Sequence, residues 1–146
     1  MKITKVRPVK TPTRGTKLSA GLDFYVPADF DFLILHPSES VVIPSGIIAS
    51  VPKGKALIAF NKSGISVNKR LQVGACVVDE DYQGEIHIHL VNVGNLSVII
   101  EPGDKIIQFI LLPVFYDIIE VVSSKKELFS LESERGAGWK GHTGTK

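Results

Sequence analysis

Glycine and proline recur along most of the chain at intervals of roughly ten residues, and this spacing restricts what the chain can fold into. Turn signals stand at Gly15, Pro27, Pro37, Pro44 to Gly46, Pro52 to Gly54, Gly64, Gly74, Gly84, Gly94 and Pro102 to Gly103. Such intervals leave room for short strands but not for helices of average length. The intervening segments are rich in β-branched and aromatic residues, which predicts strands over 41–43, 46–51, 56–60, 73–78, 86–93, 96–100 and 106–122. The sequence therefore predicts an all-β domain, as a sandwich, a barrel or a jelly roll.

Helix is expected to be a minor component. Only 62–70, with about two turns, and a turn around 123–128 have sequences compatible with a helix. The composition changes near the end, because the segment 133–146 holds four glycines and hardly any apolar residue. Such a segment cannot pack a core by itself. We therefore predict one β domain over 1–132 and a mobile tail over 133–146.

Charge and cysteine content limit which binding partners and which cellular compartment are expected. The 146 residues fit one domain, and a formal net charge of +2 gives no broad basic surface for nucleic acid. Cys76 is the single cysteine, which fits a reducing compartment. Lysine, arginine and proline interrupt the apolar residues of 1–10, so no export signal is expected there. The apolar stretch 106–116 is shorter than the ~18 residues of a membrane helix. We therefore expect a cytoplasmic protein with no membrane partner.

Two polar residues interrupt apolar segments, where an unpaired polar group costs about 1–3 kcal/mol. Gln108 lies inside the apolar run 106–111, and Asp79 follows the apolar run 75–78 and opens an acidic cluster. Gln108 has an ordinary explanation as an edge-strand residue that faces water. Asp79 has one as part of a hairpin turn that ends at Gly84. From these residues alone, both explanations stay open.

Three further features have ordinary explanations. His87 and His89 alternate on a predicted strand and share one face, but no third metal ligand lies near them, which favours an exposed or subunit-facing surface. Cys76 has no neighbouring cation to activate it, and its apolar strand predicts an inert buried thiol. The segment 136–143 is similar to a phosphate-binding P-loop, but His142 replaces the lysine and no helix follows. A glycine-rich wrap around phosphate stays open.

Five segments along the chain carry patterns with chemical content. They are Ala20-Gly21-Leu22-Asp23-Phe24, Asn61-Lys62-Ser63-Gly64, the run CVVDEDYQGEI from Cys76 to Ile86, Gly103-Asp104-Lys105-Ile106-Ile107-Gln108, and the tail from Arg135-Gly136 to Gly144. In sequence and in order they resemble the conserved motifs of the trimeric dUTP pyrophosphatases (dUTPases). Those motifs read A-G-x-D-[LF], R-S-[SG], G-V-I-D-x-D-Y-[RQ]-G-E, G-D-[RK]-I-x-Q and R-G-x-G-G-F-G-S-T-G. The resemblance spans nearly the whole chain.

The resemblance implies a fold and a reaction. The fold is a distorted, barrel-like jelly roll that forms a homotrimer with three sites between subunits. In the reaction, dUTP and water give dUMP and pyrophosphate, which keeps uracil out of DNA and supplies dUMP for dTMP synthesis. Asp79 would be the catalytic base that takes a proton from the water attacking the α-phosphorus. Mg²⁺ would be the cofactor, bound to the triphosphate and contacted through water by Asp23.

The resemblance also implies the substrate contacts. Tyr82 would lie under the deoxyribose and leave no room for a 2′-hydroxyl, and main-chain groups from Val73 to Val78 would hold uracil. The tail would close over the substrate of a neighbouring subunit and exclude water. Phosphate contacts are implied for Lys62, Ser63, Gly64 and Gln108, and tail contacts for Arg135, Trp139, Lys140, His142 and Thr143.

Some residues depart from the family pattern and leave alternatives open. Lys62 stands where the family usually has arginine, which keeps the charge but loses the planar fork. Cys76 takes a usual glycine position and leaves the strictness for dUTP over dCTP or dTTP open. Trp139, one position out of register, would stack on uracil in place of a phenylalanine. The alternatives are a dCTP deaminase on the same fold, which needs a catalytic glutamate, and a non-catalytic interaction protein, which the retained Asp79 and Arg135 disfavour.

Overall fold

The computed structural model describes residues 1–138, and most of its regular structure is β-strand. The elements in chain order are β1 (Lys2–Lys5), β2 (Leu22–Tyr25), β3 (Leu33–Leu35), β4 (Ser40–Pro44), β5 (Ile47–Ser50), β6 (Lys55–Phe60), α1 (Ser63–Asn68), β7 (Leu71–Val73), β8 (Val77–Val78), β9 (His87–Asn92), β10 (Val98–Ile100), β11 (Lys105–Pro113) and α2 (Lys125–Leu128). The prediction of an all-β fold with little helix is confirmed. The chain divides into two units, one of residues 1–115 and one that begins at Tyr116.

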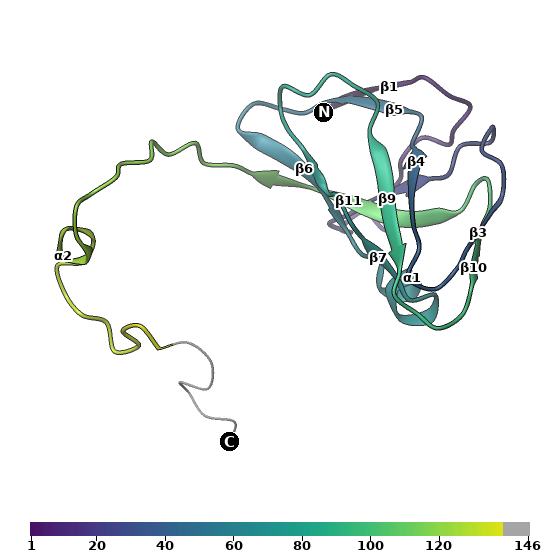
Figure 1. Cartoon of the computed structure of the whole chain (residues 1–146). Helices are drawn as coiled ribbons and strands as arrows, with labels where there is room; N and C mark the ends of the chain where they lie inside the picture. The colour runs from purple at the N-terminus through teal and green to yellow at the C-terminus, as the bar shows by residue number, and fades with distance from the viewer. Residues whose placement is uncertain (139–146) are drawn as a thin grey trace. The chain divides into compact units, whose positions relative to one another are not determined.

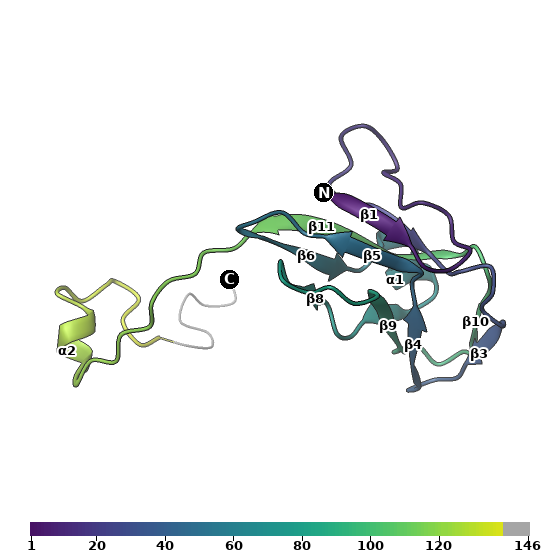
Figure 2. The same cartoon turned by 90° about the horizontal axis from the view of Figure 1, so that it is seen from above.

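The core of the first unit lies between two sheets. The larger sheet has the strand order β2-β11-β6-β8, the second has the order β4-β9-β7, and the pairs β1-β5 and β10-β3 complete the unit. In Figure 1, β4 and β9 run steeply across the view while β6 and β11 slant across it, and in Figure 2 β6 and β11 lie in one layer above β4 and β9. Leu57 and Phe109 from one sheet and Ile88 and Leu90 from the other belong to one buried cluster.

The sequence pattern of β9 and β11 explains their positions. On β9, Ile88, Leu90 and Asn92 are buried while the residues between them are more exposed, which is the alternation expected of a strand with one face on the core. β11 is nearly continuous in apolar residues because it is a central strand. A register shift in its pairing with β2 accompanies the burial of two successive residues, Ile106 and Ile107.

The structure corrects several predicted boundaries. The segment 73–78 is not one strand, because β7 ends where it leaves β9 and β8 begins where it joins β6. The predicted strand 106–122 ends at Pro113, since its partner β6 begins at the opposing Lys55. The strands β1, β2 and β3 were not predicted, because they are short and β1 is exposed along its whole length. The helix predicted over 62–70 is limited to α1, which has six residues.

In the second unit, the described residues 116–138 contain α2 as regular structure. Glu127 accepts hydrogen bonds from the hydroxyls of Ser123 at 2.6 Å and Ser124 at 3.1 Å. These bonds, above all the one from Ser123, lower the pKa of Glu127. Ile118 and Val121 are 96% and 91% exposed, so these apolar side chains are not packed into a core among residues 1–138. Among the described residues, no helix has the length and apolar character needed to cross a membrane.

Phe109→Ala should lower the free energy of unfolding by about 3–5 kcal/mol, because it leaves a cavity in the core. The Phe109 ring is 1% exposed and its centroid lies 4.5 Å from that of Phe24. Urea denaturation measures the loss. Phe32→Ala is the matched control, since the Phe32 ring is 67% exposed, and it should change stability by no more than ~0.5 kcal/mol. Equal losses in the two variants would contradict this placement of the core.

Candidate functional site

Three segments that are far apart in the sequence meet at β11. Gln108 lies opposite Asp23 of β2 on one side and opposite Phe60 of β6 on the other. Lys62 and Ser63 follow shortly after Phe60, where β6 gives way to α1. The strand pairing therefore brings the first, second and fourth of the five motif segments to one place.

Asp23 is a buried carboxylate held between two lysines. Its side chain is 7% exposed, and it pairs through Oδ1 with Lys62 Nζ and through Oδ2 with Lys105 Nζ, the latter at 3.3 Å. A buried carboxylate without a charged partner strongly destabilises a fold. The Asp23 carboxylate therefore needs the ammonium groups of Lys62 and Lys105 beside it. Asp23 thereby fixes the positions of two ammonium groups.

A pocket of about 510 Å³ opens beside this cluster. The lysine ammonium groups and the Ser63 hydroxyl are donors of the kind that bind phosphate oxygens. One lining residue is acidic, Asp104, and it lies 3.9 Å from Lys69 Nζ. The pocket is lined by Lys62, Ser63, Gly64, Ile65, Asp104, Lys105 and Gln108, and so contains all four residues predicted to contact phosphate outside the tail.

Gln108 links the pocket to the end of β7, shortly before the third motif segment. Its Nε2 donates to the carbonyl of Asn61 at 2.8 Å, and Asn61 Oδ1 accepts the N–H of Val73, also at 2.8 Å. Because β11 pairs on both sides, the explanation of Gln108 as an edge-strand residue is wrong. The Gln108 side chain also explains why position 21 is a glycine, since a Cβ on residue 21 would lie 2.1 Å from Gln108 Oε1.

The loop 79–85 is held at two points. The carboxylate of Glu80 accepts the N–H of Gly54, and Glu85 Oε1 accepts the N–H of Gly46 at 2.7 Å. Both glycines have a positive φ, a conformation that favours glycine. The loop is therefore anchored by two acids that flank its central residues.

Asp79 and Tyr82 remain exposed within this anchored loop. The Tyr82 hydroxyl donates to the carbonyl of Glu85 at 2.9 Å, and the phenol lies where a Cβ of Gly84 would be. The N–H of Tyr82 bonds to the carbonyl of Asp79 at 3.3 Å, so the predicted turn is present. Within residues 1–138, the Asp79 carboxylate makes no hydrogen bond or ion pair. Its backbone belongs to a turn, and its side chain is available.

Asp79 and Gln108 do not meet within one chain. Val78 lies opposite Leu57 of β6, and Leu57 lies opposite Leu111 of β11. From this register, Asp79 is displaced from Gln108 by two strand spacings and four residues along the strands, which amounts to about 16 Å. These two side chains of one chain therefore cannot contact the same water molecule.

The 74–76 segment, Gly74 to Cys76, connects β7 to β8 and leaves part of its main chain free. Gly74 N–H donates to the His89 carbonyl at 3.0 Å, Ala75 N–H donates to His89 Nδ1 at 2.8 Å, and the Cys76 carbonyl accepts the N–H of Ala59 at 2.8 Å. Among residues 1–138, the N–H of Cys76 and the carbonyls of Gly74 and Ala75 have no hydrogen-bond partner. One donor and two acceptors thus remain unpaired on a short stretch of backbone.

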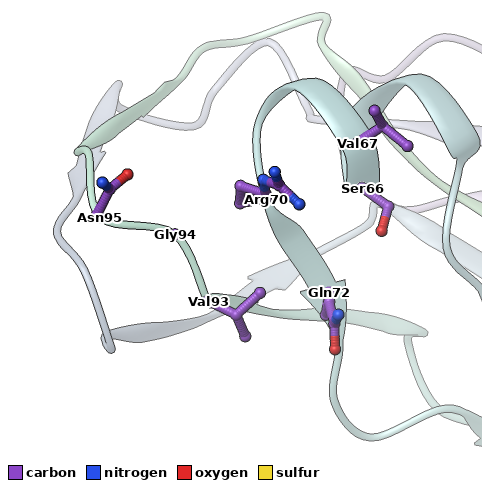
Figure 3. Close-up of a pocket in the computed structure, with 7 residues that line it drawn as sticks. All are labelled: Ser66, Val67, Arg70, Gln72, Val93, Gly94 and Asn95. Carbon is purple, nitrogen blue, oxygen red and sulfur yellow. The ribbon is translucent and has the colours of Figure 1, made fainter.

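Two further pockets have different linings, apart from Asp104, which one of them shares with the pocket beside Asp23. One of about 450 Å³ is formed by α1, β7 and the turn after β9, and Arg70, with φ 55°, projects into it. Figure 3 shows its lining residues, which are Ser66, Val67, Arg70, Gln72, Val93, Gly94 and Asn95. Another, of about 570 Å³, extends from Arg70 toward Asp104. Neither contains a residue predicted for catalysis or phosphate binding.

The remaining candidates do not form a metal site. No group of three His, Cys, Asp or Glu side chains is arranged to hold a metal ion within residues 1–138. His87 is exposed, and His89 uses Nδ1 to accept the N–H of Ala75. Cys76 lies in the connection between β7 and β8 rather than in a strand, and its side chain is only partly buried. The prediction of a buried thiol is therefore wrong.

Arg135 is the one tail candidate among the described residues. It is exposed, and its Nε donates to the carbonyl of Gly138 at 3.2 Å. Trp139, Lys140, His142 and Thr143 lie outside the described residues, and their contacts stay predictions.

Sequence reasoning missed several residues that shape the site. Asn61 was noted only as part of a motif segment, and its position between a strand and a helix was the available signal. Lys105 was likewise noted only as part of a motif, although it pairs with Asp23. Nothing in the sequence pattern indicates that His89 reaches the 74–76 segment.

An all-β chain with a lysine-lined pocket and an unpaired carboxylate on an anchored loop has the parts of a nucleotide-hydrolysing enzyme. Residues 7–144 match the family model described as dUTPase. This chain belongs to the dUTPase family. The prediction of that family, and of the enzyme class that hydrolyses dUTP, is confirmed.

Relatives and solved structures agree with this assignment. The deoxyuridine 5′-triphosphate nucleotidohydrolase of Desulfotalea psychrophila is 35% identical over 135 residues, covering 91% of this chain and 86% of the relative. That of Candida glabrata is 36% identical over 133 residues, covering 91% and 88%. The mitochondrial human enzyme is 35% identical over 133 residues, which cover 91% of this chain but 50% of the relative, so the chain spans half its length.

Among solved structures, the dUTPase of Staphylococcus bacteriophage 80alpha with dUpNHpp has a TM-score of 0.85 at 22% identity, covering 98% of this chain and 97% of that one. A variant dUTPase of phage phi11, whose structure concerns the coordination of a structural Mg(II) ion, has a TM-score of 0.76 at 20% identity, covering 86% and 97%. At these identities the likeness shows a shared fold.

Gly21→Ala should destabilise the protein by about 1–3 kcal/mol, because the new Cβ would overlap Oε1 of Gln108 and displace that side chain from Asn61. Urea denaturation measures the effect. Gly15→Ala is the matched control, since its nearest neighbour would be Ser19 Oγ at an ordinary 3.5 Å. A Gly21→Ala variant as stable as the control variant would show that Gln108 does not occupy this position.

Proposed function

We propose that this enzyme hydrolyses dUTP by attack of water at the α-phosphorus, with Asp79 as the general base. The observation that carries this assignment is the Asp79 carboxylate, exposed and without a partner among residues 1–138, on a loop anchored by Glu80 and Glu85. Water is a poor nucleophile at neutral pH, and a positioned carboxylate that takes its proton accelerates attack by about 10²–10⁴-fold. The product is dUMP, with pyrophosphate as the leaving group.

We infer that the complete site forms between copies of this chain in a homotrimer of jelly-roll subunits. The separation of about 16 Å between Asp79 and Gln108 within one chain supports this inference. A second copy would supply Asp79 and Tyr82 to the phosphate pocket of the first. A closed three-fold ring would make three such sites equivalent.

In the pocket, Lys62 and Ser63 would bind the α- and β-phosphates, and Gly64 would let the phosphate chain approach the backbone closely. The pairing of Asp23 with Lys62 and Lys105 supports this role, because it holds both ammonium groups in place before the substrate arrives. Preorganised cations stabilise the charge that develops during phosphoryl transfer without reorganising at the moment of reaction. Gln108, fixed on Asn61, would complete the wall beside the reacting phosphate.

Mg²⁺ fits this site as a partner of the triphosphate rather than as an ion held by the protein alone. Magnesium keeps several waters and binds substrate phosphates together with one or two carboxylates. Asp23 would contact it through water, since each of its oxygens has a further lone pair beside the lysine contact. When bound, the ion would neutralise charge on the phosphate oxygens.

The 74–76 segment would recognise the base. Uracil presents an N3–H between two carbonyl oxygens, so the free N–H of Cys76 would donate to one of these oxygens, and the free carbonyl of Gly74 or Ala75 would accept the N3–H. Cytosine lacks the N3–H, so a carbonyl would lose its partner at a cost of about 1–3 kcal/mol. Val73 and Val78 remain proposed contacts at the ends of this stretch. Tyr82 would pack against the deoxyribose and exclude a 2′-hydroxyl.

The tail would complete the closed site. Arg135 and Thr143 would contact phosphates, and Trp139 would stack on uracil, with Lys140 and His142 between them. Closure excludes water other than the nucleophile and strengthens every charge interaction inside the site. A cytoplasmic location remains part of the proposal and rests on Cys76, which has no partner for an internal disulfide.

The substrate test is a panel of dUTP, dCTP, dTTP and UTP with pyrophosphate release as the measurement. We expect dUTP to react fastest, UTP to be excluded by Tyr82, and chelation of Mg²⁺ by EDTA to reduce turnover of dUTP. Equal rates on all four nucleotides would overturn the assignment of the base and sugar contacts. Release of ammonia from dCTP would assign a deaminase instead.

Asp79→Asn should lower kcat for dUTP by at least ~10²-fold while KM changes little, because the amide cannot accept the proton. Gln108→Ala should also lose activity. The subunit arrangement is then tested by unfolding the two inactive variants together and refolding them as mixed trimers. With random assembly, about a quarter of the sites would combine an intact Asp79 from one chain with an intact Gln108 from another, and activity should return to that fraction.

The result of mixing separates the two arrangements. Restored activity near this fraction supports a site shared between chains. Mixed trimers that stay as inactive as each parent would place both residues in one chain and overturn the shared site. An active Asp79→Asn homotrimer would instead show that the base lies elsewhere.

A further inference from the structure

The side chain of His89 binds the backbone where the pairing of β7 with β9 ends. Val73 lies opposite Leu90, and the ladder continues with one more bond from the N–H of Gly74 to the main-chain carbonyl of His89. At the next residue the backbone turns away toward β8. The N–H of Ala75 therefore finds a side-chain acceptor, His89 Nδ1 at 2.8 Å, in place of a main-chain carbonyl.

The imidazole ring fits closely against the 74–76 segment. A Cβ on Gly74 would lie 2.2 Å from His89 Nδ1 and 2.4 Å from its Cε1, so the ring fills the space that any other residue at position 74 would need. Gly74 and His89 therefore form a matched pair. The ring is half-buried, while His87, two residues earlier on the same face of β9, is exposed and makes no side-chain hydrogen bond with residues 1–138.

The hydrogen bond also defines the state of the ring. A backbone N–H can only donate, so Nδ1 must be the unprotonated nitrogen, and a neutral ring then carries its proton on Nε2. In this tautomer Nδ1 is engaged, and the ring is not arranged as a metal ligand whose second nitrogen donates to an acceptor. His89 is therefore a fixed acceptor that points at the backbone of the 74–76 segment.

We propose that His89 is a positioning residue for base recognition: its imidazole holds the 74–76 segment in the conformation that presents the Cys76 N–H and a neighbouring carbonyl to uracil. This inference rests on the proposed role of that segment in binding the base. Asn61 holds Val73, the residue just before this segment, and joins it to Gln108 in the phosphate pocket. The His89 side chain is hydrogen-bonded to the 74–76 segment and does not line the phosphate pocket, so we expect its effect on the base rather than on the phosphates.

The test uses two variants of similar shape. His89→Leu removes the acceptor, whereas His89→Asn retains one, because its Oδ1 is as many bonds from the backbone as His89 Nδ1. Calorimetry on the whole protein measures binding of the dUTP analogue dUpNHpp and of inorganic triphosphate, both with Mg²⁺. We expect His89→Leu to raise the Kd of dUpNHpp about 3- to 10-fold, the range that the loss of one hydrogen bond produces, and to leave the Kd of triphosphate unchanged. His89→Asn should recover most of the affinity.

His87→Leu is the matched control, with the same substitution on the same face of β9, and it should bind both ligands as the native protein does. The tautomer is tested separately on protein labelled with ¹⁵N-histidine. The His89 signals, assigned by their loss in His89→Asn, should show an unprotonated Nδ1 and a protonated Nε2.

Three outcomes would overturn the proposal: equal losses in His89→Leu and His89→Asn, an effect of His87→Leu as large as that of His89→Leu, or a parallel loss of triphosphate binding. Each would indicate a general disturbance of β9. A protonated Nδ1 would overturn it as well. Failure of the proposed function is distinguishable, because native protein would then bind dUpNHpp no better than inorganic triphosphate.

Discussion

The pairing of β11 on both of its edges is the constraint on which the site depends. Gln108 lies between Asp23 on one neighbouring strand and Phe60 on the other, and the chain after Phe60 leads into the phosphate pocket. A slip of one residue would move Gln108 to the core face and Phe109 to the opposite face. The buried ring of Phe109 makes such a slip costly, so packing of the core and placement of the site are fixed by the same register.

The cluster of Asp23, Lys62 and Lys105 connects stability to chemistry. Two ammonium groups would repel each other if they converged on an empty pocket, and a buried carboxylate alone would be unstable. Together they form a network that is satisfied before any nucleotide binds. Binding of a triphosphate then adds negative charge at a place where positive charge is already held. The same residues thus connect β2, β11 and the start of α1, and in the proposed function they would prepare the pocket for phosphate.

The chemistry is divided between parts of the chain that are held by different means. The phosphate pocket depends on strand pairing within one sheet. The loop with Asp79 and Tyr82 depends on hydrogen bonds from Glu80 and Glu85 to two turn glycines. The 74–76 segment depends on two side chains, since Asn61 holds the preceding Val73 and His89 holds Ala75. Because Asp79 lies about 16 Å from Gln108 along this scaffold, the active site proposed above would combine parts from different copies of the chain.

The sequence by itself determined the fold class and the family, because turn spacing is a local property and the five motifs keep their order along the chain. It also identified Asp79, Lys62 and Gln108 as candidates. It could not show that Gln108 lies in a central strand, that 73–78 is interrupted at Gly74 to Cys76, or that His89 supports that interruption. Tertiary structure decided these points, since each depends on which strand lies alongside which, and a hydrogen bond between Ala75 and His89 follows from the register of two strands rather than from any pattern within either.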